Sequence, residues 1–319
     1  MVSEFEFINN IKSRYSLDRI GDDCAVLPKD AETDLLITTD LLIEDIDFRL
    51  EWMSPEHLGH KALAVSLSDI AAMGGDPKWA TLSIGVPEEL WRSPFIDDFY
   101  SGWHKLAAMF GVELIGGDTS RSPDKLIIDC MVGGETSRSG AINRAGARPG
   151  DAIFVTGPLG GAAGGLDLLE KGARFDPKNR KNTDELVLRQ LKPWPRVAEG
   201  KLLQKTQFVT AMIDLSDGLS SDLGHICDSS SVGAVIESHL APIDPFLIHE
   251  FPSDADRFDL FLNGGEDFEL LFTARKVSRS TLESMGFHFI GTVTESVGVI
   301  ELHDDLGIAV LSPTGFRHF

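Results

Sequence analysis

The sequence predicts an α/β fold, with some α+β character, in two domains. Short apolar runs typical of buried strands alternate with helical patterns along the chain, and this alternation is typical of α/β proteins. The chain has 319 residues, which by the rule of about 150 residues per domain is enough for one large domain or two medium ones. A loop rich in glycine and proline divides it at 144–151. We therefore place one domain at residues 1–140 and a second at 141–319.

The elements of the first domain follow from spacing and capping residues. Ser54, Pro55 and Glu56 are typical of a helix start, with serine as the N-cap and proline in the first turn. Gly111 is suited to end a helix that Pro94 interrupts. In chain order we predict a helix at 1–20, a turn entering a strand at 21–27, a strand at 35–40, helices at 54–69 and 88–110, and strands at 112–115 and 126–132.

The second domain begins with a strand at 152–157, followed by a glycine-rich turn that opens a helix near Ala162. The remaining predicted elements are a charged loop at 171–185, helices at 197–203 and 218–227, two apolar runs within 260–273, and a strand-rich tail. Two short motifs recur at an offset of 148 residues: Leu67–Asp69 returns as Leu215–Asp217, and 116–118 returns as 264–267. The recurrence hints at related halves, but matches of three residues also arise by chance.

Charge and composition exclude several classes of protein. The net charge is −21, which argues against binding nucleic acids or anionic membranes, since both require a basic face. No apolar run approaches the length of a membrane span, and the acidic N-terminus lacks the basic region of a signal peptide. Cys24, Cys130 and Cys227 are far apart. We interpret them as reduced thiols of a cytoplasmic protein.

Acidic residues recur beside glycines or at the polar ends of apolar runs. Ligands of α/β proteins bind at strand ends, and carboxylates gathered there would repel one another unless they were protonated or bound cations. Hard oxygen ligands select Mg²⁺ or Mn²⁺, and Mg²⁺ often completes its shell with substrate phosphates. The pattern therefore favours metal-assisted phosphoryl transfer. The residues concerned are Asp22, Asp23, Asp40, Asp69, Asp118, Asp214 and Asp217.

Asp69 is the hardest of these to explain as a turn residue. Leu58, Ala62, Val65, Asp69 and Met73 follow steps of three or four residues, so Asp69 lies on the apolar stripe of a helix. A carboxylate on such a stripe is either paired inside the protein or a ligand. For Asp22, Asp118 or Asp217 taken singly, a turn remains the simpler interpretation.

Two further motifs each have two interpretations. The glycine-rich turn at 157–165 either cradles a phosphate at a helix N-terminus or packs closely against a strand. It is neither a Walker motif nor a GxGxxG motif. His57 and His60 are one helical turn apart, and they are either part of a zinc site or residues of a solvated helix face.

Taken together, these motifs resemble the thiamine-monophosphate kinase family. That family belongs to the superfamily of aminoimidazole ribonucleotide synthetase, selenophosphate synthetase and the hydrogenase-maturation dehydratase. The matching segments arrive in the family's order and cover most of the chain: 21–27 (GDDCAVL), 38–40 (TTD), 61–77 (KALAVSLSDIAAMGGDP), 115–119 (IGGDT), 144–151 (RAGARPGD), 213–219 (IDLSDGL) and 264–270 (GGEDFEL).

The resemblance implies a fold in which an N-terminal mixed-sheet domain pairs in a homodimer and a C-terminal α/β domain completes a site between the domains. It implies ATP-dependent phosphorylation of thiamine monophosphate to thiamine diphosphate by direct in-line transfer, with several Mg²⁺ ions. The acceptor phosphate is already ionised, so no strong base is needed, and catalysis depends on positioning and charge neutralisation.

The resemblance also assigns site residues. The metal cluster would be served by Asp23, Thr38, Thr39, Asp40, Asp69, Asp118, Asp214 and Asp217. ATP contacts fall on Gly117, Asp118, Arg144 and Ser216, and catalytic roles on Asp69, Asp118, Asp217 and Arg144. The substrate-side residues are Asp47, Glu266 and Phe316.

Two substrate-side positions depart from the family. Asp47 stands where the family usually has histidine, and an ionised aspartate accepts hydrogen bonds but cannot donate them. Phe316 stands where tyrosine or tryptophan is frequent and keeps only the stacking face. Two alternative functions therefore remain open besides the kinase activity. The chain could be another ATP-using synthetase or dehydratase of the superfamily, or a non-catalytic paralogue that binds ATP and Mg²⁺. No cysteine precedes Cys24 and the chain ends without one, which disfavours selenophosphate synthetase and the dehydratase.

Overall fold

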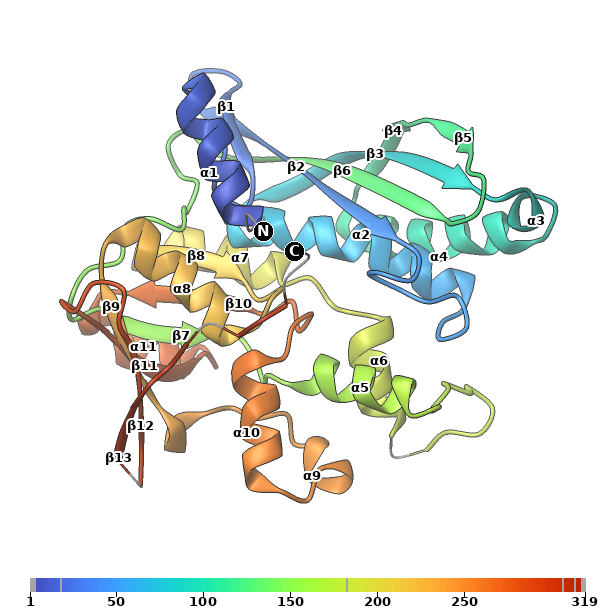
Figure 1. Ribbon diagram of the computed structural model, residues 1–319. Coiled ribbons are helices and arrows are strands. Elements are labelled where there is room, and N and C mark those ends of the chain that lie inside the picture. Colours follow the sequence, from blue (N-terminus) through green and yellow to red (C-terminus); the bar gives the residue numbers. More distant parts are fainter. Residues whose placement is uncertain (1–3, 18, 182, 306, 313, 317–319) are drawn as a thin grey trace.

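Two β-sheets, one from each half of the chain, form the frame of the molecule, and helices pack on both (Figure 1). The structure is a computed structural model that describes residues 4–17, 19–181, 183–305, 307–312 and 314–316. Both sheets mix parallel and antiparallel pairs. This arrangement confirms the predicted α/β fold with α+β character.

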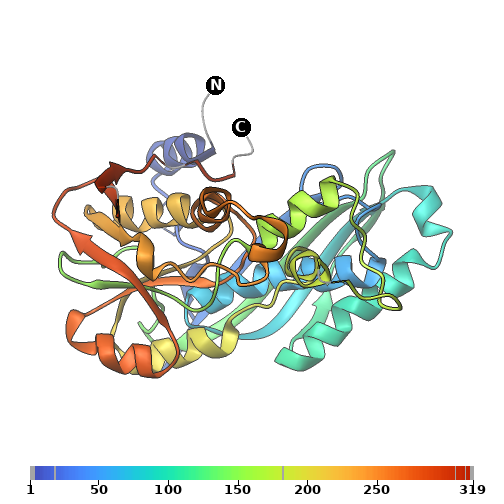
Figure 2. The same ribbon diagram turned by 90° about the horizontal axis from the view of Figure 1, so that it is seen from below.

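The first half contains a sheet ordered β1-β2-β6-β3-β4, with the short β5 also paired to β3. Helices α2 and α4 cover one face of this sheet, as Figures 1 and 2 both show. The elements are α1 (Glu4–Tyr15), β1 (Ala25–Pro28), β2 (Thr33–Ile43), α2 (Pro55–Ala72), β3 (Asp76–Val86), α3 (Glu88–Trp91), α4 (Phe95–Phe110), β4 (Glu113–Gly116), β5 (Thr119–Arg121) and β6 (Ile127–Ser137).

The second half contains a sheet ordered β13-β12-β9-β11-β7-β10-β8. Its elements are β7 (Ala152–Val155), α5 (Gly161–Glu170), α6 (Asp184–Leu191), α7 (Val197–Thr206), β8 (Val209–Asp214), α8 (Leu219–Ser230), β9 (Gly233–Glu237), α9 (Leu247–Glu250), α10 (Asp254–Asn263), β10 (Leu270–Ala274), α11 (Arg279–Ser284), β11 (His288–Thr294), β12 (Ile300–Asp304) and β13 (Gly307–Val310), with 3-10 turns at Ser238–Leu240 and Lys276–Ser278. The chain passes between the sheets at 138–151, and the division at 140/141 remains a prediction.

Helix α2 lies between the two halves (Figure 1). It contacts β2, β6 and α4 of the first half and α6, α7 and β8 of the second. Because it is covered on all sides, nearly every residue from Leu58 to Ala72 is buried. No helix in the described ranges is long and apolar enough to cross a bilayer.

Helices α2 and α4 approach each other closely because each has a glycine that faces the backbone of the other helix. A Cβ on Gly59 would lie 1.9 Å from the Phe99 carbonyl oxygen, and a Cβ on Gly102 would lie 1.9 Å from the Glu56 carbonyl oxygen. Any larger residue at either position would separate the helices.

Several predicted boundaries are confirmed. The Ser54 side chain accepts a hydrogen bond from the His57 N–H with Pro55 in the first turn, the predicted second helix is broken at Pro94, and Gly111 ends α4 with a left-handed φ of 68°. The glycine-rich turn opens α5 at Gly161.

Other expectations were wrong. No strand was predicted at 76–86, where β3 lies in the first sheet, and no helix at 254–263, where α10 lies. The recurrence at offset 148 does not reflect related structure, because Leu67–Asp69 lies inside α2 whereas Leu215–Asp217 lies in the loop between β8 and α8.

The three cysteines are free thiols, as predicted. Cys24, Cys130 and Cys227 are all buried.

Candidate functional site

Four aspartates from different elements converge where α2 meets both sheets. Asp23 precedes β1, Asp40 lies on β2, Asp69 on α2, and Asp214 ends β8. One carboxylate oxygen each of Asp23, Asp69 and Asp214 lie within 4.8 Å of one another. The position of Asp69 on an apolar helix is thereby explained, because its carboxylate meets other carboxylates in the middle of the molecule.

Burial and mutual repulsion disfavour the charged forms of this cluster. Burial and the neighbouring carboxylates raise the pKa of Asp40 to about 6 and that of Asp214 to about 8. The same causes raise the pKa of Asp69 well above its ordinary value. Within the described part of the chain, the Oδ2 atoms of Asp23 and Asp40 are buried and accept no hydrogen bond. Buried, unpaired carboxylate oxygens are a donor set that suits a hard divalent cation such as Mg²⁺.

Arg144 is the cationic residue at this cluster. Its Nη2 lies 2.6 Å from Asp23 Oδ1, and its backbone N–H donates to Asp22 over 2.8 Å. Burial alone would lower the pKa of Arg144, but the charge and hydrogen bond of Asp23 raise it above its ordinary value. The guanidinium group is therefore a permanent positive charge at the edge of the acidic cluster.

The two threonines before Asp40 face opposite sides of β2. The Thr38 hydroxyl is buried and donates to Asp69. The Thr39 hydroxyl donates to Asp129 on β6, on the other face of the sheet. Side chains alternate along a strand, so Thr38 and Asp40 share the cluster side while Thr39 does not.

The structure does not bring Gly117 and Asp118 to the cluster within one chain. Asp40 pairs with Cys130, and Cys130 pairs with Leu82 of β3. The segment that contains Asp118 lies beyond β3, and its carbonyl accepts from the Ile84 N–H over 2.8 Å. At about 4.8 Å per strand, Asp118 is about 14 Å across the sheet from Asp40.

The second group of predicted residues gathers around the loop between β8 and α8. The Ser216 carbonyl accepts a hydrogen bond from the Glu266 N–H over 2.8 Å, and the Asp217 carbonyl accepts one from the Phe316 N–H over 3.2 Å. The tail of the chain thus crosses this loop and places Phe316, which is about half exposed, beside it. Asp217 also lies with Asp222 and His225 in a group whose ligand atoms are within 4.8 Å of one another.

Asp47 lies near the acidic cluster, in the loop after β2. Its Oδ2 accepts from the Ile43 N–H over 2.8 Å, so it stabilises the turn in which it lies. Its negative charge also helps to raise the pKa of Asp40. The aspartate in the histidine position is therefore compatible with the local backbone.

The glycine-rich turn is a packing feature. The Asp267 carboxylate accepts from Gly160 N–H over 2.6 Å and from Ala162 N–H over 3.0 Å, so it caps α5. A Cβ on Gly161 would meet Asp244, and one on Gly165 would meet the Leu186 carbonyl at 2.1 Å. An anionic cap already occupies the position that a phosphate would take, so the phosphate-cradle interpretation is wrong.

The two histidines on α2 form no zinc pair in the described structure. His60 is buried, with its ring nitrogen 2.7 Å from the Pro193 carbonyl oxygen, and His57 packs edge-on against Phe175. The prediction that they lie on a solvated helix face was also wrong, because loops of the second half pack on the imidazole rings of both His57 and His60.

Several residues that were not predicted contact predicted site residues. Asp129 accepts from Thr39, while Lys61 and Gln190 contact Glu266. Lys61 could have been identified from the sequence, because it precedes Val65 by four residues and Asp69 by eight and so lies on the apolar stripe of α2. Asp129 and Gln190 carry no comparable signal.

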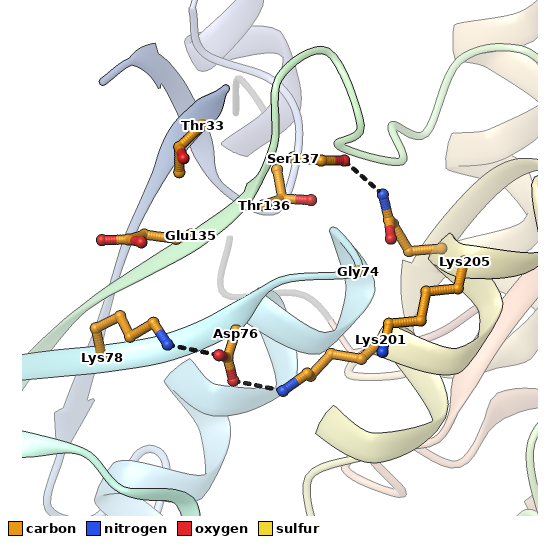
Figure 3. Close-up of a pocket in the computed structure, with 10 residues that line it drawn as sticks. Thr33, Gly74, Asp76, Lys78, Glu135, Thr136, Ser137, Lys201 and Lys205 are labelled. Carbon is orange, nitrogen blue, oxygen red and sulfur yellow. Dashed lines mark hydrogen bonds and ion pairs between the residues drawn. The ribbon is translucent and has the colours of Figure 1, made fainter. Parts of the chain in front are cut away.

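A cavity of about 320 Å³ lies elsewhere, between the ends of β2, β3 and β6 and helix α7 (Figure 3). Lys78 and Lys201 both point to Asp76, and Gln204 donates to Ser137 over 2.9 Å. None of the predicted site residues lines it. We interpret it as a polar seam between the two halves of the chain.

Comparison with known proteins places the chain in a family. Residues 21–136 match the model of the AIR synthase related protein, N-terminal domain, and residues 148–310 match that of the C-terminal domain. The thiamine-monophosphate kinase of Buchnera aphidicola subsp. Acyrthosiphon pisum is 39% identical over 99% of both chains, and that of Bacillus subtilis is 37% identical over 100% of both.

A solved structure described as AaThiL complexed with AMPPCP and TMP is also similar. It is 33% identical, with a TM-score of 0.88 over 100% of this chain and 97% of that chain. Full-length identity at this level and the agreement of the folds lead to one conclusion: the chain belongs to the thiamine-monophosphate kinase family, a group of phosphotransferases among the AIR synthase related proteins.

Proposed function

We propose that this chain transfers the γ-phosphoryl group of ATP directly to the phosphate of thiamine monophosphate. The bond between the γ-phosphorus and its bridging oxygen to the β-phosphate breaks. A new bond forms to an oxygen of the acceptor phosphate, which yields thiamine diphosphate and ADP. The observation that carries the proposal is the convergence of Asp23, Asp69 and Asp214, with Asp40 beside them, in a member of this family.

The acidic cluster is proposed to hold Mg²⁺. Its unpaired buried oxygens and raised pKa values support this assignment, because a divalent cation would relieve the repulsion between the carboxylates. Bound Mg²⁺ would neutralise charge on the phosphates of ATP and of the acceptor. The ligands proposed at the cluster are Asp23, Thr38, Asp40, Asp69 and Asp214, with Asp118 and Asp217 as further candidates. The Thr39 side chain faces the other side of β2, so it is no longer proposed as a ligand.

The other site residues are assigned by their chemistry. Arg144 offers a permanent cation for ATP phosphates, while Gly117, Asp118 and Ser216 complete the nucleotide contacts. The carboxylate of Glu266 and the ring of Phe316 suit a cationic thiazolium and a pyrimidine. The ionised acceptor phosphate needs no strong general base, so the residues act by positioning and charge neutralisation.

We also propose a homodimer that acts in the cytoplasm. The face of the first sheet that faces away from α2 and α4 carries apolar side chains, among them Leu41, Ile115 and Ile127, which are 55%, 55% and 37% exposed. Thr39 and Asp129 lie on this face too. A second copy covering this face would bury these side chains.

The test is a discontinuous assay. Purified protein is incubated with ATP, Mg²⁺ and thiamine monophosphate, and thiamine diphosphate is quantified by chromatography, with free thiamine as control acceptor. We expect product only when all three components are present. ATP binding without product would refute the kinase proposal. It would favour the ATP- and Mg²⁺-binding paralogue, for which the substitution at Asp47 is the one supporting observation.

A further inference from the structure

Lys61 is a charged residue in the most deeply buried helix of the protein. The whole residue is 0% exposed, and its neighbours on α2 are almost all apolar. A lysine in such a place is rare unless it is paired, because an uncompensated ammonium group is costly to bury. Its Nζ lies 2.7 Å from Oε1 of Glu266. Among the described residues, Glu266 is the only acid within ion-pair distance of Lys61.

The Glu266 carboxylate is held from two sides. Lys61 of α2 contacts Oε1, and the Gln190 side-chain amide of α6 donates to Oε2. The backbone of Glu266 is fixed as well, since its N–H donates to the Ser216 carbonyl and its φ is +65°. A glutamate rarely adopts this left-handed conformation, so the surrounding contacts must stabilise it. The side chain nevertheless stays 29% exposed.

This arrangement leaves an oriented acceptor group at the surface of the site. Among the described residues, each carboxylate oxygen has one partner, Lys61 for Oε1 and Gln190 for Oε2, and retains acceptor capacity for a ligand. An ionised carboxylate donates nothing, so its ligand must bring N–H donors or positive charge. The thiamine moiety brings both, in its amino-pyrimidine and its thiazolium ring.

The position of this anchor agrees with the length of the substrate. Lys61 and Asp69 are eight residues apart on the same helix, which corresponds to about 12 Å along the axis. An extended thiamine monophosphate is of the same order of length. A substrate whose phosphate lies at the acidic cluster would therefore reach Glu266 with its rings.

We propose that Lys61 and Gln190 are positioning residues that hold Glu266 as an oriented anion and thereby determine recognition of the thiamine end of the acceptor. The inference rests on the proposed function, because it assigns how the same site selects its substrate. Lys61 belongs to the first half of the chain and Gln190 and Glu266 to the second. The anchor is thus assembled from both halves and depends on their relative position.

The experiment measures steady-state kinetics of Lys61→Met and Gln190→Met in the full chain, with both substrates varied. We expect the KM for thiamine monophosphate to rise at least tenfold in Lys61→Met and severalfold in Gln190→Met. The KM for ATP and kcat should stay within about twofold, since removal of binding that is equal in ground and transition states changes KM alone. His60→Leu is the matched control. His60 is the buried neighbour of Lys61 but contacts Pro193 instead, so this variant should leave both KM values unchanged.

A double-mutant cycle separates positioning from a general packing effect. In a Glu266→Gln background, adding Lys61→Met should raise the KM for thiamine monophosphate by less than twofold, because the anion that Lys61 holds is gone. Equal rises in both KM values, or an unchanged KM in folded Lys61→Met, would overturn the inference. If Lys61→Met does not fold, an unchanged KM in Gln190→Met overturns it. If the unmodified enzyme makes no thiamine diphosphate, the proposed function itself fails, which is a separate and recognisable result.

Discussion

Asp69 is the residue at which stability and catalysis are expected to oppose each other. Burial is the main cause that raises the pKa of its carboxyl group. The nearby carboxylates of Asp40, Asp214 and Asp23 raise that pKa further. Asp69→Asn relieves this repulsion but removes a proposed metal ligand. We expect kcat to fall by at least about 100-fold, while the melting temperature stays the same or rises.

The exposed Asp97 of α4 provides the control for this substitution. Asp97→Asn removes the same charge from the chain and should leave kcat unchanged. A folded Asp69→Asn enzyme with near-normal turnover would refute the shared-metal site.

The pH dependence of stability follows from the same carboxylates. The pKa values of Asp40 and Asp214 are raised to about 6 and about 8, above the unfolded value of about 4. A carboxyl group whose pKa is higher in the folded state stabilises that state in its protonated form. This stabilisation is greatest below about pH 4 and is lost as the pH rises through the folded pKa. The metal-free protein should therefore melt at a lower temperature at pH 8.5 than at pH 6.

Mg²⁺ should reverse this trend, because it binds the ionised cluster and its stabilising effect grows with pH. Differential scanning calorimetry at both pH values, with Mg²⁺ and with a chelator, measures the effect. Asp214→Asn should flatten the slope of the metal-free protein. A slope that is unchanged in that variant would show that other groups govern the pH dependence.

At the scale of elements, the close contact of α2 and α4 is expected to be intolerant of added volume. The Cβ of Gly59→Ala would lie 1.9 Å from the Phe99 carbonyl oxygen. The helices would have to separate, and we expect the free energy of unfolding to fall by about 1–3 kcal/mol. Urea denaturation measures this change. Gly85→Ala on β3 is the control, because its nearest contact would be an ordinary 3.6 Å, and a loss as large as that of Gly59→Ala would rule out the packing explanation.

Elements with strong local signals were predictable, and those defined by tertiary contacts were not. Ser54 and Gly111 fix helix ends by their own capping chemistry, which is readable in sequence. Strand β3 begins Asp-Pro-Lys and contains Gly85, residues that disfavour strands. It is a strand because β6 pairs with it along almost its whole length.

The candidate site also has features that the sequence predicts and features that depend on tertiary structure. Its aspartates were predictable because each stands at a readable place, such as the apolar stripe for Asp69. The separation of Asp118 from the cluster was not predictable, because it depends on the order of strands in the sheet. The opposite orientation of Thr39, by contrast, follows from the alternation of side chains along β2. The cap that Asp267 places on α5 joins residues about a hundred positions apart, and no local pattern reveals it.

For the whole molecule, the proposed dimer is expected to share its active sites. Asp118 lies about 14 Å from Asp40 within one chain by strand spacing, so we expect the partner subunit's Asp118 to serve the cluster. Asp118→Ala and Asp69→Ala chains should each be inactive alone. Unfolded together and refolded, they should recover about 25% of wild-type activity, because half of the dimers are mixed and each of those has one intact site.

The matched control mixes Asp40→Ala with Asp69→Ala chains, whose defects lie in the same cluster and cannot complement each other. Recovery in neither mixture would show that each subunit uses its own Asp118. Sedimentation of the refolded mixtures checks that dimers have formed.

The burial of α2 on all sides also has a consequence during protein synthesis. The side of α2 that faces away from the first sheet is covered by α7 and β8, which the ribosome makes long after α2 itself. The nascent first half therefore exposes an apolar helix until the second half emerges, and such surfaces attract chaperones and favour aggregation. We expect the two halves to become stable together, so that a chain interrupted between the sheets would not leave behind a durable N-terminal fragment.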